Sequence, residues 1–240
     1  MLIFAHRGAS AYCIENTIKS FKMAFEMNAG IETDIRLTKD DVLICFHDPC
    51  VKIGKKQYAI KDLTFKELRE LQFEDNRKIP TLREVFECID PPDEYKFSFD
   101  IGSKNAGKEI IELAKEYSLL NDIFITDTRL TILKALRRES QSVQLIHTVP
   151  HIVSKIKENS LNFQTLEDLN IKIINIKANK YLKENFSTVV NKGFKCFFWG
   201  VNSRIRMKKI LQLNVNGEKV EGIYSDYPDK LHELKKKYLN

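Results

Sequence analysis

The chain has 240 residues, of which 43% are hydrophobic, including 15 Phe, 8 Tyr and 1 Trp. This composition supports a sizeable packed core and excludes an intrinsically disordered protein. The formal net charge of +6 is compatible with an anionic substrate. The basic residues are spread over amphipathic segments and the C-terminal KKKYLN, with no interleaved aromatic pattern, so we do not expect a nucleic-acid partner.

The cysteines and the first residues bear on the cellular compartment. Five cysteines, odd in number and irregularly spaced, form no CxxC pair, which indicates reduced thiols. The opening MLIFAHRGAS lacks a basic segment, and its apolar run is too short for a signal peptide or a membrane span. We expect a cytoplasmic protein without stable membrane insertion; the sequence leaves the oligomeric state open.

Short apolar runs alternate with amphipathic segments from the first residues onward. LIFA (2–5) predicts a strand, and NTIKSFKMAFEM predicts a helix over 16–28, with Asn16 or Thr17 as its N-cap and Ile18, Phe21 and Phe25 on one stripe. Two strands follow at 31–37 and 42–46. A short helix is expected in KDLTFKELREL, and another over 82–89.

The second half of the chain repeats a strand and then a helix, with one of the helices at 107–117. Strands are predicted at 96–101, 122–126, 143–147, 172–176, 195–199 and 221–225. This alternation indicates a parallel sheet, and about eight such units in roughly 250 residues indicate a TIM (β/α)8 barrel. A doubly wound open sheet is the alternative, but no GxGxxG follows the first strand. Without a Pro/Gly-rich linker, we expect a single domain over 1–240, with 49–80 as a small inserted subdomain.

The sequence predicts nine strands, one more than a TIM barrel has. The four residues TKDD between the second and third predicted strands explain the extra strand. A parallel crossover needs about a dozen residues, so 31–37 and 42–46 should form an antiparallel hairpin. If its turn centres on Lys39-Asp40, paired residue numbers sum to 79. Glu32 then lies opposite His47, and Asp34 lies opposite Cys45.

Charged residues gather where the predicted strands end, which is the face that carries TIM-barrel active sites. Three carboxylates suit Mg²⁺ or Ca²⁺, whereas zinc more often recruits histidine or cysteine. Arginine can bind phosphate oxygens, and two histidines can act as general base and general acid. The residues are His6, Arg7, Glu32, Asp34, His47 and Asp100. Together they describe metal-assisted cleavage of a phosphodiester.

Each of these residues also has a purely structural interpretation. Either histidine could be structural, and the acids at 32 and 34 could form a solvated edge. Asp100 could be a cap, and Arg7 could pair with Glu15. His147 and His151, at HTVPH, could reach the barrel mouth, although surface or capping roles are expected.

Several segments resemble the glycerophosphodiester phosphodiesterase family. They are HRGAS (6–10), IENT (14–17), GIETDIRLTKDDVLICFHD (30–48), IPTLREVF (79–86), FFWGVNS (197–203) and EGIYSDYP (221–228). The resemblance covers nearly the whole chain, most specifically near the N-terminus. It implies a TIM barrel with an insertion after the hairpin. It also implies hydrolysis of a small glycerophosphodiester to glycerol 3-phosphate and an alcohol.

The resemblance also implies roles for individual residues. Glu32 and Asp34 fall on the family's metal ligands, with Asp100 at the step where the family has a third acid. His6 and His47 fall on its acid–base pair.

Three further residues match positions around the substrate. Arg7 matches a phosphate-binding arginine, and Glu15 belongs to a segment that lines the site. Trp199 matches an aromatic at the barrel mouth, although it could equally be a core residue.

The chain departs from the family pattern at its fourth strand. Asp100-Ile101-Gly102 stands where the family usually has Glu-x-Lys, so the phosphate loses a positive charge that Lys104 could replace. This departure keeps open a catalytically degenerate barrel that binds a phosphorylated ligand. A related phospholipase acting on intact lipid is a third reading.

Overall fold

Eight parallel strands close into a barrel in the computed structural model, which describes residues 1–88 and 96–239. Each strand pairs with the next around the ring, and β13 pairs with β1 to complete it. The predicted TIM barrel is confirmed. The strands in ring order are β1 (Leu2–Ala5), β2 (Gly30–Leu37), β6 (Phe97–Ile101), β7 (Ile123–Asp127), β8 (Gln144–Thr148), β9 (Ile173–Lys177), β10 (Lys195–Trp199) and β13 (Gly222–Ser225).

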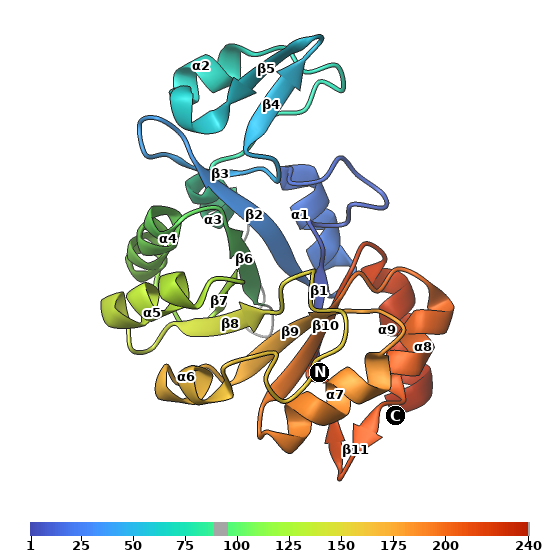
Figure 1. Cartoon of the computed structure of the whole chain (residues 1–240). Helices are drawn as coiled ribbons and strands as arrows, with labels where there is room; N and C mark the ends of the chain where they lie inside the picture. The colour runs from blue at the N-terminus through green and yellow to red at the C-terminus, as the bar shows by residue number, and fades with distance from the viewer. Residues whose placement is uncertain (89–95, 240) are drawn as a thin grey trace.

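Helices between the strands form the outer layer (Figure 1). They are α1 (Ile18–Glu26), α3 (Leu82–Cys88), α4 (Lys104–Glu116), α5 (Leu130–Glu139), α6 (Phe163–Asp168), α7 (Leu182–Asn191), α8 (Arg204–Leu211) and α9 (Pro228–Leu239). The helix predicted over 82–89 matches α3, except that residue 89 lies outside the described residues. In α1 the side chain of Thr17 accepts from the Ser20 N–H, as the N-cap prediction requires. Across the described residues, no helix is both long and apolar enough to span a membrane.

The predicted hairpin exists, but its register differs by one residue from the prediction. β3 (Leu43–Cys45) runs antiparallel to β2, and Ile35 pairs with Cys45, so paired numbers sum to 80 rather than 79. The reason is a longer turn: the Thr38 N–H donates to the Val42 carbonyl at 3.1 Å, which leaves a three-residue loop. Asp41 closes this loop in the left-handed conformation, with φ at 58°.

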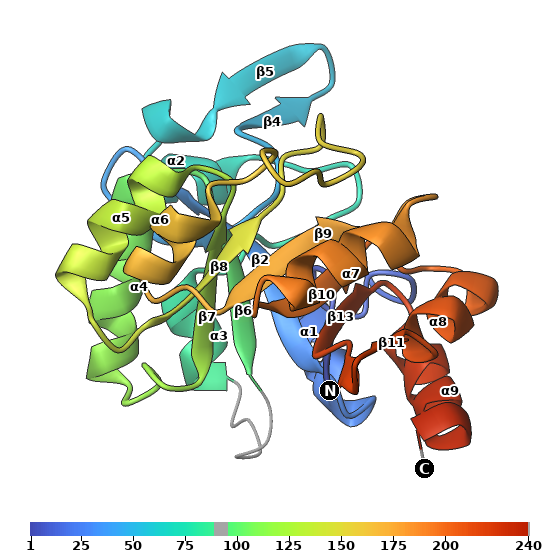
Figure 2. The same cartoon turned by 60° about the horizontal axis from the view of Figure 1, so that its bottom comes forward.

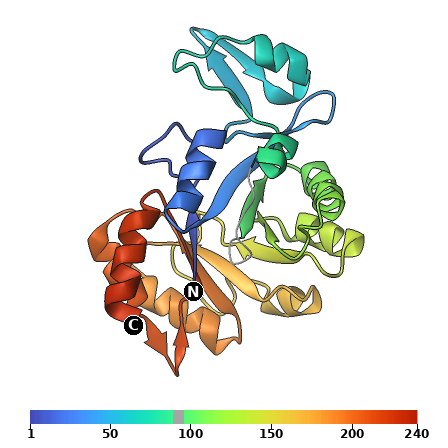
Figure 3. The same ribbon diagram turned by 180° about the vertical axis from the view of Figure 1, so that it is seen from behind.

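Residues 49–80 form a small layer beside the barrel, at the top of Figure 1 and again in the view from behind in Figure 3. It contains the hairpin β4 (Cys50–Ile53) and β5 (Lys56–Ala59), the 3-10 helix η1 (Ile60–Asp62) and α2 (Phe65–Glu70). Its apolar cluster includes Val51, Ile60 and Leu68 and continues to Ile44 of β3. A second short hairpin, β11 (Asn214–Val215) with β12 (Glu218–Lys219), follows α8.

The barrel interior changes from apolar to polar along the strands, whose arrangement Figure 2 shows from a second side. Its buried cluster consists of Phe4, Phe124, Ile146, Ile173, Phe197 and Tyr224. Phe4 stacks on Tyr224 with ring centroids 5.0 Å apart. Because side chains two residues apart share a face of a strand, the next inward residues after Phe4, Ile146 and Ile173 are polar. Apolar side chains therefore fill the interior of the barrel, and polar side chains line its end at the C-termini of the strands, where a functional site can form.

Candidate active site

A cavity of about 390 Å³ lies at the C-terminal ends of the barrel strands. It brings together seven of the eight predicted site residues. They are His6, Arg7, Glu32, Asp34, His47, Asp100 and Trp199. The eighth, Glu15, is not among the lining residues; it lies behind Arg7.

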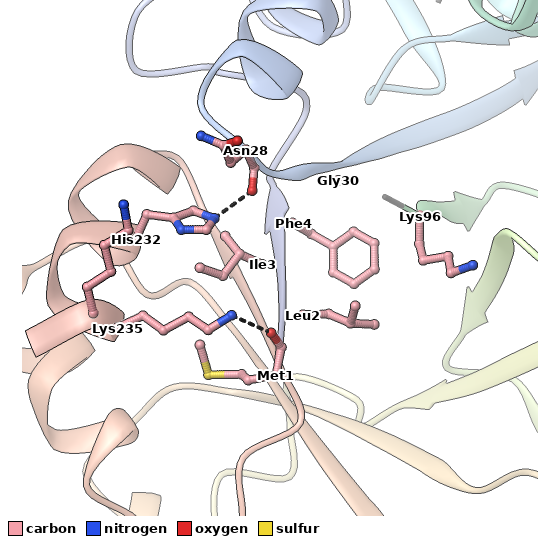
Figure 4. Close-up of a pocket in the computed structure, with 10 residues that line it drawn as sticks. Met1, Leu2, Ile3, Phe4, Asn28, Gly30, Lys96, His232 and Lys235 are labelled. Carbon is pink, nitrogen blue, oxygen red and sulfur yellow. Dashed lines mark hydrogen bonds between the residues drawn. The ribbon is translucent and has the colours of Figure 1, made fainter. Parts of the chain in front are cut away.

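A second cavity of the same volume lies at the opposite end of the barrel (Figure 4). It is lined by the first residues of the chain and by basic side chains, including Lys96 and Lys235, and none of its lining residues in the described part of the chain is acidic. His232 contacts the Asn28 carbonyl there, at 2.5 Å. Since active sites of TIM barrels lie at the C-terminal ends of the strands, the acid-lined cavity is the candidate active site.

Strand register places the three acids on one wall. Asp34 of β2 pairs directly with Asp100 of β6, and Glu32 lies two residues earlier on the same face as Asp34. Burial raises the pKa of Glu32 to about 8, and the charges of Asp34 and Asp100 add to this shift. Asp100 opens to the cavity, yet desolvation and the charge of Asp34 raise its pKa to about 7. Burial and mutual repulsion therefore disfavour the ionised forms of Glu32 and Asp100.

A divalent cation fits these acids in charge and in ligand type. Their oxygens do not yet form a ready ligand set: within residues 1–88 and 96–239, no three His, Cys, Asp or Glu side chains are placed to hold a metal ion together. Asp34 instead accepts from the Asn16 side-chain amide at 3.3 Å. Binding a cation would require the carboxylates to turn toward a common point.

His6 directly follows β1 and is held by Asp226, for which the sequence predicted no role. Its Nδ1 lies 2.8 Å from Oδ1 of Asp226, and its Nε2 lies 4.0 Å from Glu32. Burial lowers the pKa of His6, but the Asp226 hydrogen bond and the Glu32 charge outweigh this effect and leave the pKa raised. Asp226 lies in the segment EGIYSDYP, so its sequence context did carry a signal.

His47 reaches the same cavity although the predicted register was wrong. β3 ends at Cys45, so the chain has left the strand before His47 and the register no longer fixes its side. Its Nδ1 lies 2.7 Å from Oδ1 of Asp48. Its carbonyl accepts from Nε of Arg36 at 3.0 Å. The side chain is 45% exposed, which leaves the imidazole at the cavity mouth.

Arg7 takes a left-handed backbone conformation, with φ at 56°. Its backbone N–H donates to Glu32 at 2.9 Å, and its Nε lies 3.2 Å from Asp34 as an ion pair without hydrogen-bond geometry. Nη1 donates to both Glu15 oxygens, at 3.0 and 3.2 Å. Arg7 therefore both pairs with Glu15 and lines the cavity, as the two interpretations of the sequence allowed.

Arg36 occupies the space next to Gly102, the position at which the family pattern has a lysine. A Cβ at Gly102 would lie 2.5 Å from Nη1 of Arg36 and 3.0 Å from its Cδ. Lys104 does not replace the lysine, because it begins α4 and does not line the cavity. The lysine that does line the cavity is Lys177, at the end of β9.

The model of the Glycerophosphoryl diester phosphodiesterase family matches residues 6–230. The chain belongs to this family. It is therefore an enzyme of the phosphodiesterase class. The glycerophosphodiester phosphodiesterase of Caldanaerobacter subterraneus is 28% identical over 98% of both chains. That of Bacillus altitudinis is also 28% identical, over 97% of both.

Solved structures of the family share the barrel. The glycerophosphodiester phosphodiesterase of Thermotoga maritima superposes with a TM-score of 0.76 at 24% identity, covering 98% of both chains. A phosphodiesterase of Oleispira antarctica, solved with the product sn-glycerol-3-phosphate, gives 0.81 at 20% identity and covers 97% of this chain and 96% of its own. At these identities the likeness concerns the fold.

The phosphodiesterase cavity has a second wall that the sequence did not predict, apart from Trp199 and the possibility that His151 reaches the barrel mouth. It comes from the ends of β7 to β10 and includes Thr126, Thr148, His151, Asn175 and Lys177. His151 thus lines the site, whereas His147 is buried at 3% exposure and does not. The signal was the two-residue alternation: each of Thr126, Thr148 and Asn175 follows an apolar inward residue at that spacing.

Proposed function

We propose that this chain hydrolyses glycerophosphodiesters to glycerol 3-phosphate and an alcohol, using a divalent cation and two histidines. The observation that carries the proposal is the shared cavity of three acids, two histidines and Arg7. Family membership supports the substrate class. The printed product of the Oleispira relative, sn-glycerol-3-phosphate, supports the product.

Glu32, Asp34 and Asp100 would hold the cation, which is Mg²⁺ or Ca²⁺ on the basis of their oxygen ligands. When bound, the cation neutralises charge on the phosphate and lowers the pKa of a neighbouring hydroxyl. Arg7 lines the same cavity and would bind a phosphate oxygen. Glu15, predicted to bind substrate, would contribute by holding Arg7 in place through two hydrogen bonds.

We assign His6 as the general base and His47 as the general acid. His6 is held by Asp226 beside the acids, where it can take the proton of the glycerol hydroxyl that attacks phosphorus. His47 lies at the exposed mouth, where it can protonate the departing alcohol. The P–O bond to the alcohol breaks as the new P–O bond forms a cyclic phosphate. Water then opens this ring with the two roles reversed.

The test is release of glycerol 3-phosphate from glycerophosphocholine and glycerophosphoglycerol, measured with Mg²⁺ or Ca²⁺. EDTA should abolish the release, and adding back the cation should restore it. Turnover that persists after exhaustive chelation would refute the metal role. A cytoplasmic location, as expected from the sequence, is part of the proposal because the substrate is a small water-soluble diester.

Gly102 supports a second candidate, a degenerate barrel that binds a phosphorylated ligand without turning it over. The glycine removes the lysine that the family pattern has at this position. The same assay separates the two: this candidate predicts binding of glycerol 3-phosphate with no release from either diester. Release from intact phospholipid in place of the small diesters would favour the third reading, a related phospholipase.

A further inference from the structure

The active-site cavity is divided into two walls of different charge. The wall from β1, β2 and β6 carries the acids, whereas the described residues that line the wall from the ends of β7 to β10 include no carboxylate. Lys177 is the only lysine or arginine among the lining residues of that second wall. The proposed chemistry occupies the acidic wall with the phosphate and the attacking glycerol hydroxyl. The leaving alcohol is then left facing Lys177 and its neighbours.

The ammonium group of Lys177 lies over the ring of Trp199, the aromatic side chain of this wall. Its Nζ lies 5.0 Å from the ring centroid of Trp199, within cation–π range. His151 meets the same ring edge to face, with centroids 4.8 Å apart. An aromatic face is the surface that binds a quaternary ammonium, but here the protein's own ammonium already covers it. A choline head group would meet both a blocked ring and a like charge.

The polar groups beside Lys177 suit hydroxyls. Asn175 is 6% exposed and donates through Nδ2 to Thr148 at 3.2 Å. Within residues 1–88 and 96–239, its Oδ1 has no hydrogen-bond partner, nor does Nε1 of Trp199. The wall therefore presents the Lys177 ammonium as a donor at its surface, with an unpaired acceptor and an unpaired donor buried beside it, and hydroxyl groups match all three.

We propose that the wall of Thr148, His151, Asn175, Lys177 and Trp199 is a leaving-group subsite that selects polyhydroxy alcohols, such as glycerol, over quaternary ammonium alcohols. This inference rests on the proposed function, since that function places the alcohol on this wall. Lys177 determines the specificity by repelling a cation and by donating to hydroxyls.

The experiment compares kcat/KM for glycerophosphoglycerol and glycerophosphocholine in the wild type and in Lys177→Met. The wild type should prefer the glycerol ester by about tenfold, and Lys177→Met should bring the ratio near one. Lys180→Met is the matched control. Lys180 also lies over an aromatic ring, 5.1 Å from the Tyr181 centroid, but it does not line the cavity, so its loss should leave the ratio unchanged.

The outcomes separate this inference from the function on which it rests. A wild type that prefers the choline ester would overturn the subsite. So would a Lys177→Met variant that lowers both rates equally, because Lys177 would then act on the shared phosphate. Hydrolysis of neither ester would refute the proposed function instead. In that case the subsite is tested by binding alone. Trp199 is the only tryptophan in the chain, so its fluorescence in EDTA-treated protein reports which diester binds more tightly, and tighter binding of the choline ester would overturn the subsite.

Discussion

His6 Nδ1 lies 2.8 Å from Asp226 Oδ1, although 220 positions separate the two residues. The contact exists because β1 pairs with β13 where the barrel closes, so the residues that follow these two strands meet. A carboxylate in this position fixes the ring orientation of a base and stabilises its protonated form. Barrel closure thus places Asp226 beside His6, the proposed general base.

Asp226→Asn should lower kcat by about ten- to a hundredfold, because an amide orients the imidazole without stabilising its charge. The charge of Asp226 helps to raise the pKa of His6, so the variant should also move the His6 limb of the pH–rate profile to lower pH. The rate loss is read from kcat, and the shift of the limb from kcat/KM against pH. A lower rate with an unmoved limb would reduce Asp226 to a structural role.

His47→Ala should reduce turnover by about two to four decades while the circular dichroism spectrum stays unchanged. The side chain is 45% exposed, so truncation leaves no large cavity in the core. His232→Ala is the control: His232 lines the cavity at the far end of the barrel and should tolerate loss of its ring without loss of rate. A near-wild-type rate for His47→Ala would remove this residue from the mechanism.

Gly102 and Arg36 should be energetically coupled. A methyl group at 102 would collide with Arg36, whose Nε holds the His47 carbonyl at 3.0 Å. Gly102→Ala should therefore lower kcat by roughly tenfold with little change in KM, and Arg36→Ala should do the same. The double variant should be no slower than Arg36→Ala alone. Strictly additive losses would show that the two residues act independently.

His147 should make the protein less stable in mild acid. Desolvation lowers its pKa from 6.5 to about 4, so the unfolded chain takes up a proton at pH 5 that the folded chain does not. Its contribution is therefore present above pH 6.5 and is lost as the pH falls toward 4. Between pH 7 and pH 5 this residue should remove about 2 kcal/mol from the free energy of unfolding.

Urea unfolding of the wild type and of His147→Asn at both pH values measures this contribution. The variant should lose less stability than the wild type over the interval, since every other titrating group is common to both. Equal losses in the two proteins would mean that His147 is charged in the folded state.

The sequence by itself determined the barrel and most of its active site. Alternating strands and helices specify a parallel sheet, and the residues that end the strands predicted the acids, His6 and Arg7, because all strand ends of such a barrel meet at one face. The short TKDD turn also predicted the antiparallel β2–β3 hairpin. These inferences succeeded because they depend on local periodicity and loop length.

Only the tertiary structure decided which side chains meet across the barrel. The register of β2 with β3 depends on the turn between them. Asp41 adopts the left-handed conformation and closes a loop one residue longer than predicted, which shifts the pairing by one residue. The contacts of Asp226 with His6, of Arg36 with the space beside Gly102, and of Lys177 with Trp199 each join residues at the ends of different strands. Such pairs depend on barrel closure and strand stagger, which act over the whole ring, and no local pattern of residues encodes them.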